Sequence, residues 1–171
     1  YSTHLGNAKI LTIGSDSDFV VSDGELLLYN GEGGDVVLPT GVEKIGQSAF
    51  QNCKTITNIT FNEALKSVGK YAFSGCTSLK SITFNDALES IGNYAFYESD
   101  DIKNVSISGT NATIGAWAFA DSNGNSELES VEIKDGVVRI GEGAFHTNKA
   151  LKTVTIAGTV KTIDWYAFNF C

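Results

Sequence analysis

The chain has 171 residues and a formal net charge of −8 at pH 7. Apolar residues make up 42% of it, which is too many for a disordered chain. It has only 12 basic residues, with Arg139 the single arginine, so we expect no nucleic acid partner, because such binding depends on clustered Lys and Arg. No run of about 18 apolar residues occurs, and we expect no membrane insertion in this chain.

The N-terminal part, residues 1–35, is expected to form an N-terminal segment and a β-hairpin cap. Residues 9–13 have the composition of a strand, and the loop 14–18 follows. The segments 18–21 and 25–29 flank the turn Ser22-Asp23-Gly24, and an Asp-Gly pair between apolar runs is a strong hairpin signal. The chain contains no methionine, so we expect it to be part of a longer translation product.

An Ala-Phe pair then recurs along the chain, at spacings of 23, 23, 23, 26 and 23 residues. A fixed period in the twenties is typical of a leucine-rich-repeat-like solenoid, in which each repeat contacts its neighbours. We therefore assign residues 36–171 to five full repeats and a truncated sixth. The pairs are Ala49-Phe50, Ala72-Phe73, Ala95-Phe96, Ala118-Phe119, Ala144-Phe145 and Ala167-Phe168.

Each repeat carries the same columns of residues. Alternating apolar residues such as Ile82 and Phe84 predict a strand with one face inward. The Ala-Phe pair is placed on a short helical turn, with Phe in the interior. A glycine column precedes it, which indicates a positive φ or a close backbone approach. Its members are Gly46, Gly69, Gly92, Gly115 and Gly141, and Asp164 replaces glycine in the last repeat.

The pattern apolar-Gly-x-x-Ala-Phe-x-x-Cys-x-x-Leu-x-x-Ile, as in VGKYAFSGCTSLKSITF, resembles the BspA-type leucine-rich repeat and covers residues 36–171. The resemblance implies a right-handed repeat solenoid of the α/β type, with parallel strands on one face and short helical turns on the other. It also implies a protein secreted from, or displayed on, bacterial or protist cells, with adhesion to host proteins in some members. The chain departs from the pattern at Asn111 and Asp164.

Catalytic and metal-binding residues have little support in the sequence. Cys53, Cys76 and Cys171 share one column and are expected to be free, largely buried thiols. No nucleophile elbow, phosphate loop or Cys-x-x-Cys motif is present, so we expect neither an enzyme nor a cofactor.

The spacing of 26 residues arises from an insertion within residues 121–132. Asp121, Asn123 and Asn125 match the first ligand positions of a calcium loop, and Glu132 matches its last position. Ser126 stands where that loop needs glycine, and Leu128 belongs to the core. A longer turn is therefore the favoured interpretation, with calcium as the weaker one.

Two surfaces are candidates for binding. The first is the outward strand face, which is rich in hydrogen-bonding groups: Asn58, Thr60, Ser81, Thr83, Asn104, Ser106, Ser130, Glu132, Thr153 and Thr155. The second is an aromatic column before the Ala-Phe pair: Tyr71, Tyr94, Trp117 and Tyr166, with Gly143 between the last two. The simpler interpretations are a polar face kept for solubility and rings that pack on one another.

Three functional hypotheses follow. The first is a non-enzymatic protein-binding or adhesion module of a secreted or cell-surface protein, which binds a protein partner, such as a host extracellular-matrix or plasma protein, through the strand face. The second is a structural spacer in a larger surface protein, with no ligand of its own. The third and most distant is carbohydrate binding on the aromatic column.

Overall fold

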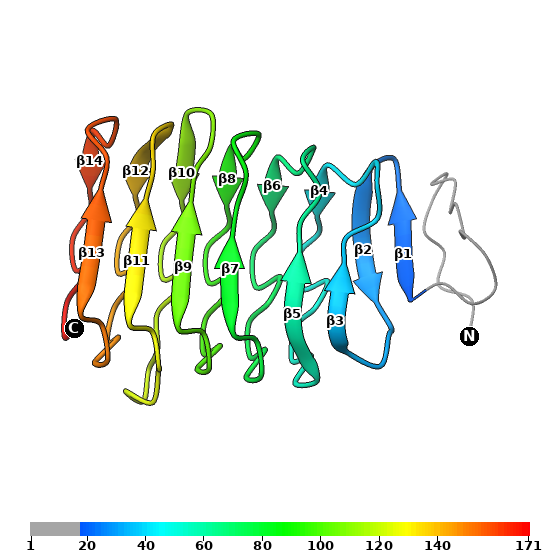
Figure 1. Ribbon diagram of the computed structural model, residues 1–171, viewed down its shortest axis with the longest axis horizontal. Coiled ribbons are helices and arrows are strands. Elements are labelled where there is room, and N and C mark those ends of the chain that lie inside the picture. The colour runs from blue at the N-terminus through cyan, green and yellow to red at the C-terminus, as the bar shows by residue number, and fades with distance from the viewer. Residues whose placement is uncertain (1–17) are drawn as a thin grey trace.

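The structure is a computed structural model, and it describes residues 18–171. The strand expected over residues 9–13 and most of the loop after it lie outside the described residues. The described residues form fourteen strands and no helix (Figure 1). The strands are β1 (Phe19–Ser22), β2 (Glu25–Tyr29), β3 (Gly34–Val37), β4 (Lys44–Ile45), β5 (Ile56–Thr60), β6 (Ser67–Val68), β7 (Ser81–Thr83), β8 (Ser90–Ile91), β9 (Asn104–Ile107), β10 (Ala112–Ile114), β11 (Ser130–Ile133), β12 (Val137–Ile140), β13 (Thr153–Ile156) and β14 (Thr162–Ile163).

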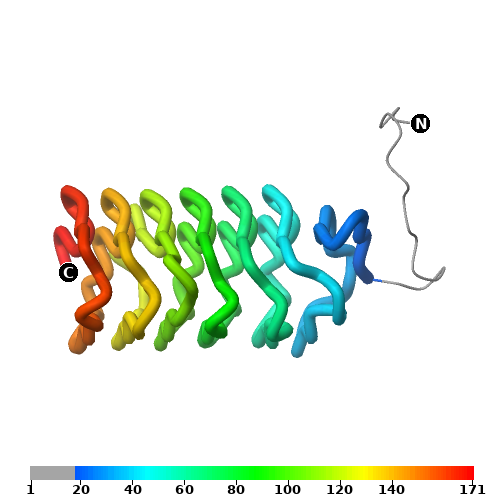
Figure 2. Tube along the Cα trace, turned by 90° about the horizontal axis from the view of Figure 1, so that it is seen from above, coloured from blue at the N-terminus to red at the C-terminus, as the bar shows by residue number. Residues whose placement is uncertain are grey.

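The strands stack into a β-solenoid of about six turns with a repeat of about 23 residues. The sheet that we call the large sheet has the order β1-β2-β4-β6-β8-β10-β12-β14. The opposite side carries a four-stranded sheet, β7-β9-β11-β13, and a two-stranded sheet, β3-β5. Each coil from β3 onward therefore gives one strand to each side (Figure 1), and Figure 2 shows the coils side by side along the long axis.

The strands of the solenoid pair in parallel, except for the first two. β1 and β2 form an antiparallel hairpin around Asp23 and Gly24, both of which have positive φ. β2 then pairs in parallel with β4, so the hairpin continues directly into the large sheet. A second strand in each coil was not anticipated from the sequence, because β4, β6, β8 and β14 have only two residues each and show no alternation.

The core is organised around one continuous stack of aromatic rings. Its members are Tyr29, Phe50, Phe73, Phe96, Phe119, Phe145 and Phe168, and the centroids of neighbouring rings lie 4.6–5.2 Å apart. This separation matches the spacing of adjacent strands, about 4.8 Å. The prediction that the Phe of each Ala-Phe pair fills the solenoid interior is confirmed, since Phe50, Phe73 and Phe145 are fully buried.

The prediction of short helical turns around the Ala-Phe pair is wrong. In the first repeat, Ala49 and Gln51 donate their N–H groups to carbonyls three residues earlier, whereas Ser48 and Phe50 donate to Lys70 and Ala72 of the next coil. In a helix, successive N–H groups would instead all donate to carbonyls of the same segment, four residues earlier. In addition, the residue before each Ala has a φ between 56° and 60°, a left-handed conformation that ends any helix: Ser48, Tyr71, Tyr94, Trp117, Gly143 and Tyr166.

The glycine column serves close packing between coils. None of its members has a positive φ. A Cβ atom added to Gly92 would lie 2.7 Å from the backbone carbon of Gly69 and 2.7 Å from the backbone nitrogen of Lys70. Of the two roles indicated by the sequence, the close approach is therefore the one observed.

Candidate functional site

The predicted binding residues of the four-stranded sheet lie in two straight rows. The parallel register aligns Ser81, Asn104, Ser130 and Thr153 in one row, and Thr83, Ser106, Glu132 and Thr155 in the other. All eight side chains are exposed or half-buried, and the residues between them in β7, β9 and β11, such as Val105 and Val131, are buried, whereas Val154 in β13 is exposed. The strands thus place the predicted residues on one outward face, which we call the strand face.

Part of the strand face is already hydrogen-bonded to itself. The Ser130 Oγ donates to Oδ1 of Asn104 at 2.6 Å, and the Ser106 Oγ donates to Oε2 of Glu132 at 3.1 Å. Lys134 lies 3.4 Å from the same Glu132 oxygen. These contacts fix the side chains in the middle of the face, so that a ligand would meet preorganised groups there.

The other two predicted residues, Asn58 and Thr60, belong to β5, which pairs with β3 rather than with β7. The Asn58 Nδ2 donates to Oδ1 of Asp35 at 2.6 Å. Where the two sheets meet, a cleft of about 390 Å³ opens between β5 and β7, with Thr60, Ser81 and Thr83 in its lining. The structure therefore brings three of the predicted residues together around one hollow.

The predicted aromatic column does not form a continuous ladder. Tyr71 and Tyr94 stack with centroids 5.1 Å apart, and both rings are half-buried. Trp117 instead packs over Gly143 and against His146, whose ring centroid lies 4.9 Å away. Tyr166, in the last coil, is 54% exposed. The arrangement favours rings that pack on one another over a ligand platform.

The insertion at residues 121–126 is a turn organised by a buried carboxylate. Asp121 is only 2% exposed, and its two oxygens accept hydrogen bonds from the backbone N–H groups of Asn123 and Ser126, both at 2.8 Å. Within residues 18–171, no three His, Cys, Asp or Glu residues converge on a metal position. The geometry thus supports the longer turn. The Asp121 carboxylate, which the calcium hypothesis would use as a ligand, accepts hydrogen bonds from backbone N–H groups of the turn instead.

Asp100 lies beside this turn, and its Oδ1 is buried without a hydrogen-bond partner. A small cavity of about 10 Å³ separates it from Asp121 and Ser126, which is room for about one water molecule. Burial, and secondly the charge of Asp121, raises the pKa of Asp100. The site can hold a proton more tightly than an exposed aspartate, but its size excludes a larger ligand.

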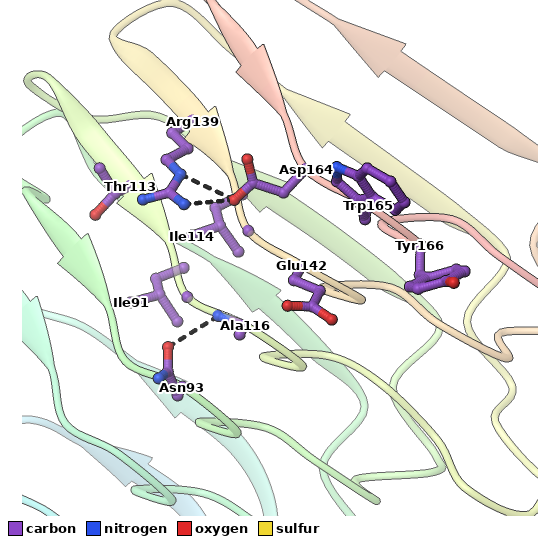
Figure 3. A pocket seen from close by; sticks show the side chains of 12 residues that line it. Ile91, Asn93, Thr113, Ile114, Ala116, Arg139, Glu142, Asp164, Trp165 and Tyr166 are labelled. Carbon is purple, nitrogen blue, oxygen red and sulfur yellow. Dashed lines mark hydrogen bonds and ion pairs between the residues drawn. The ribbon is translucent and has the colours of Figure 1, made fainter.

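A feature that the sequence did not single out is a groove of about 700 Å³ on the outer face of the large sheet (Figure 3). Arg139 donates from Nε and Nη2 to Oδ2 of Asp164, at 2.9 and 2.6 Å. Glu142 and Asn93 lie further along the groove, and Asn93 accepts a hydrogen bond from the backbone of Ala116. The sequence signal that could have indicated this groove is Asp164, which replaces glycine in its column and is followed by Trp165.

The comparisons with known proteins agree with this architecture. The BspA type leucine rich repeat region matches the chain in six copies, over residues 28–126 and 122–171. The chain belongs to the BspA-type leucine-rich repeat family. No curated protein matches it.

Solved structures of other bacterial repeat proteins have the same fold. A leucine rich cell surface protein from Faecalibacterium prausnitzii A2-165 is 27% identical, with a TM-score of 0.70 over 89% of this chain and 42% of that protein. A leucine-rich repeat protein from Bacteroides ovatus is 24% identical, with a TM-score of 0.69 over 99% of this chain and 51% of that protein. The leucine rich repeat protein of T. pallidum is 22% identical, with a TM-score of 0.61 over 88% of this chain and 80% of that protein. The chain thus spans about half or less of the first two relatives.

The cysteine column of the BspA-type repeat has a structural explanation. The Cys76 Sγ donates to the carbonyl of Phe50 at 3.1 Å, and the Ser99 Oγ donates to that of Phe73 at 2.8 Å. Asn148 makes the same contact with Phe119 at 2.9 Å. Ser99 and Asn148 stand in the cysteine column, so in these three repeats the column supplies a hydrogen-bond donor to the preceding coil, which a thiol, a hydroxyl or an amide can provide. Ser122, in the same column, donates to Glu98 instead. The cysteines are free, as expected, and burial raises the pKa of Cys76 to about 12, but Cys171 is exposed.

One further finding concerns the membrane. Among the described residues, no helix has the length and apolar character needed to cross a bilayer.

Proposed function

We propose that this BspA-type repeat chain is a non-enzymatic protein-binding module of a secreted or cell-surface protein, and that it binds its partner through the strand face. The observation that carries the proposal is the alignment of polar side chains in two rows beside the cleft between β5 and β7. Rows of this kind offer an extended and regularly spaced surface of donors and acceptors, as other solenoids do for their protein partners.

The chemistry of the strand face suits a polar protein surface. Its rows contain Ser, Thr and Asn, with Glu132 and Lys134 as the charged pair near the centre. An interface of this type obtains its specificity from hydrogen bonds, and preorganised side chains lose less conformational entropy on binding. A host extracellular-matrix or plasma protein remains the proposed class of partner.

The proposed location follows from relatives. The resemblance to BspA-type proteins supports a secreted or surface-displayed protein, and the F. prausnitzii relative is described as a cell surface protein. The chain's own acidic charge, −8, also agrees with a partner other than nucleic acid.

The alternative is a structural spacer in a larger surface protein. It is favoured by the hydrogen bonds that the strand face makes with itself, Ser130 to Asn104 and Ser106 to Glu132, because satisfied side chains need no partner. Carbohydrate binding on the aromatic column has less support, since Tyr71 and Tyr94 stack on each other.

The deciding experiment is binding of the purified chain to immobilised extracellular-matrix and plasma proteins. Thr83 is changed to Glu, and Ser106 and Thr155 are changed to Arg, so that together with Glu132 the row carries bulky side chains of alternating charge. The control variant carries the same three side chains on the other side of the solenoid, as Ser67→Glu, Ser90→Arg and Gln47→Arg, and its new carboxylate then lies in its row between Lys44 and the new guanidinium of the Ser90→Arg substitution. A saturable signal lost only in the first variant supports the proposal. Silence across the panel from the folded protein favours the spacer.

A further inference from the structure

We propose that the groove on the large sheet binds a short neutral oligosaccharide, with Trp165 as the surface on which a sugar ring stacks. The groove, drawn in Figure 3, is lined by residues of β8, β10 and β12 and by residues that follow β14, and these four strands belong to the large sheet. The strand face belongs to the sheet on the opposite side of the solenoid (Figure 1). The groove is therefore a site separate from the one proposed for a protein partner.

The first argument is that Asp164, which breaks the glycine column, meets two residues in this groove that differ from their nearest counterparts, Arg139 and Trp165. Arg139 stands in register with the small residues Thr113 and Thr162 of the adjacent coils, and the other basic residue of this column, Lys44, is separated from it by the coils of β6, β8 and β10. Asp164 occupies the glycine column, and Trp165 follows it in a column whose other members are Gln47, Lys70, Asn93, Ala116 and Glu142. In a regular array, residues that depart from the local pattern are expected at functional sites. Their convergence on one hollow is not required by the fold.

The second argument is that the exposure of Trp165 does not result from its position in the last coil. Ile163, in the same coil, is 50% exposed, whereas its counterpart Ile140 is completely buried, so the exposure of this inward column depends on the neighbouring coil. The counterparts of Trp165 behave differently: Asn93 and Glu142 are exposed in the interior of the stack. Trp165, 79% exposed, therefore points outward as the rest of its column does.

The third argument is the chemistry of the lining. The ion pair with Asp164 holds the Arg139 guanidinium in place, and its remaining N–H groups are donors. Glu142 and Asn93 add a carboxylate and an amide. Planar groups of this kind match the adjacent hydroxyls of a pyranose, whose C–H face packs against an aromatic ring. The lining also contains Ile91 and Ile114, but both are buried, so that Trp165 and Tyr166 are its only exposed large apolar side chains. It therefore has little to hold the apolar anchoring side chain of a peptide.

The fourth argument is charge and size. Arg139 neutralises Asp164, and Glu142 leaves the groove with an excess of negative charge, in a chain of net charge −8. An acidic glycan would be repelled, so the ligand is neutral. The volume of about 700 Å³ lies within the usual range for ligand sites, about 300–1,000 Å³, and suits a few sugar rings.

The test uses the folded chain and four neutral probes: cellotetraose, maltotetraose, mannotetraose and tetra-N-acetylchitotetraose. Calorimetry measures binding, and acrylamide quenching of tryptophan fluorescence reports on Trp165, with the half-buried Trp117 as the internal reference. We expect at least one probe to bind saturably and to protect Trp165 from the quencher.

Three substitutions restore the residue types of the repeat columns and so should leave the fold intact: Arg139→Thr, Asp164→Gly and Trp165→Gln. Each is expected to weaken binding at least tenfold without lowering the melting temperature appreciably. Gln47→Ala, in the Trp165 column but in the first repeat, is expected to bind as the parent chain does. The proposal is overturned if none of the probes binds at millimolar concentration, if binding survives all three substitutions, or if an acidic oligosaccharide or a peptide binds where the neutral sugars do not.

Discussion

The glycine column gives the sharpest test of how the coils are held together, through the substitution Gly92→Ala. The added Cβ would lie 2.7 Å from the backbone of the preceding coil, whereas ordinary contact begins at 3.4 Å, so that the two coils must separate locally by about 0.7 Å. A gap of about 0.5–1 Å forfeits roughly a quarter to a half of the dispersion attraction between the atoms concerned. We expect the substitution to destabilise the chain by about 3 kcal/mol, at the upper end of the usual cost of overpacking.

The matched control is Gly158→Ala. Nothing lies within 4 Å of a Cβ atom at Gly158, and its φ is not positive. This substitution is expected to be neutral or to stabilise the chain by about 0.5 kcal/mol through the unfolded state. Urea denaturation followed by circular dichroism measures both variants. The account of the glycine column fails if the two variants have the same free energy of unfolding, or if Gly92→Ala costs less than about 1 kcal/mol.

Three further predictions concern the core and its titratable groups. Phe96→Ala should cost about 4 kcal/mol, because Phe96 is stacked on both sides, whereas Phe168→Ala should cost clearly less; equal costs in urea denaturation would contradict a continuous stack. Cys171 should react with DTNB in the native protein, and Cys76, with a pKa of about 12, only on unfolding; a Cys76 that reacts as fast as Cys171 would contradict its burial. Burial raises the pKa of Asp100 above its usual 3.8, so the native state binds this proton more tightly and the stability that Asp100 contributes falls as pH rises between the two values. Asp100→Asn should therefore raise the melting temperature at pH 7 and remove this part of the pH dependence; an unchanged pH profile would show that the carboxyl is not desolvated.

Much of the fold could be predicted because each coil repeats the same physical constraints. The recurrence of Ala-Phe fixed the period, and the alternation around Ile82 and Phe84 identified the buried face of one strand, both from local pattern alone. The helical turn was mispredicted because the sequence does not show where the N–H groups of Ser48 and Phe50 go. They bond to the next coil, and that long-range choice, together with the left-handed residue before each Ala, replaces a helix with a series of turns.

The outward positions of the strand face were predictable for the same reason, since a parallel register converts a column in the sequence into a row in space. The cleft between β5 and β7 was not, because the break between two sheets has no sequence pattern. The groove on the large sheet was missed because it combines residues from four coils, and only the pairing of β12 with β14 brings Arg139 to Asp164.

Asp164 ties the packing of the solenoid to its surface chemistry. At every other position of its column a Cβ atom would lie 2.6–2.8 Å from the backbone of the coil before it, so a side chain there opposes close stacking. Residues at outward positions, by contrast, change at a cost of about 0.5 kcal/mol or less, and a solenoid can vary them freely. A carboxylate in the glycine column therefore has no packing advantage to explain it. Its contacts with Arg139 instead hold a guanidinium over the groove, where the two side chains can act on a ligand together.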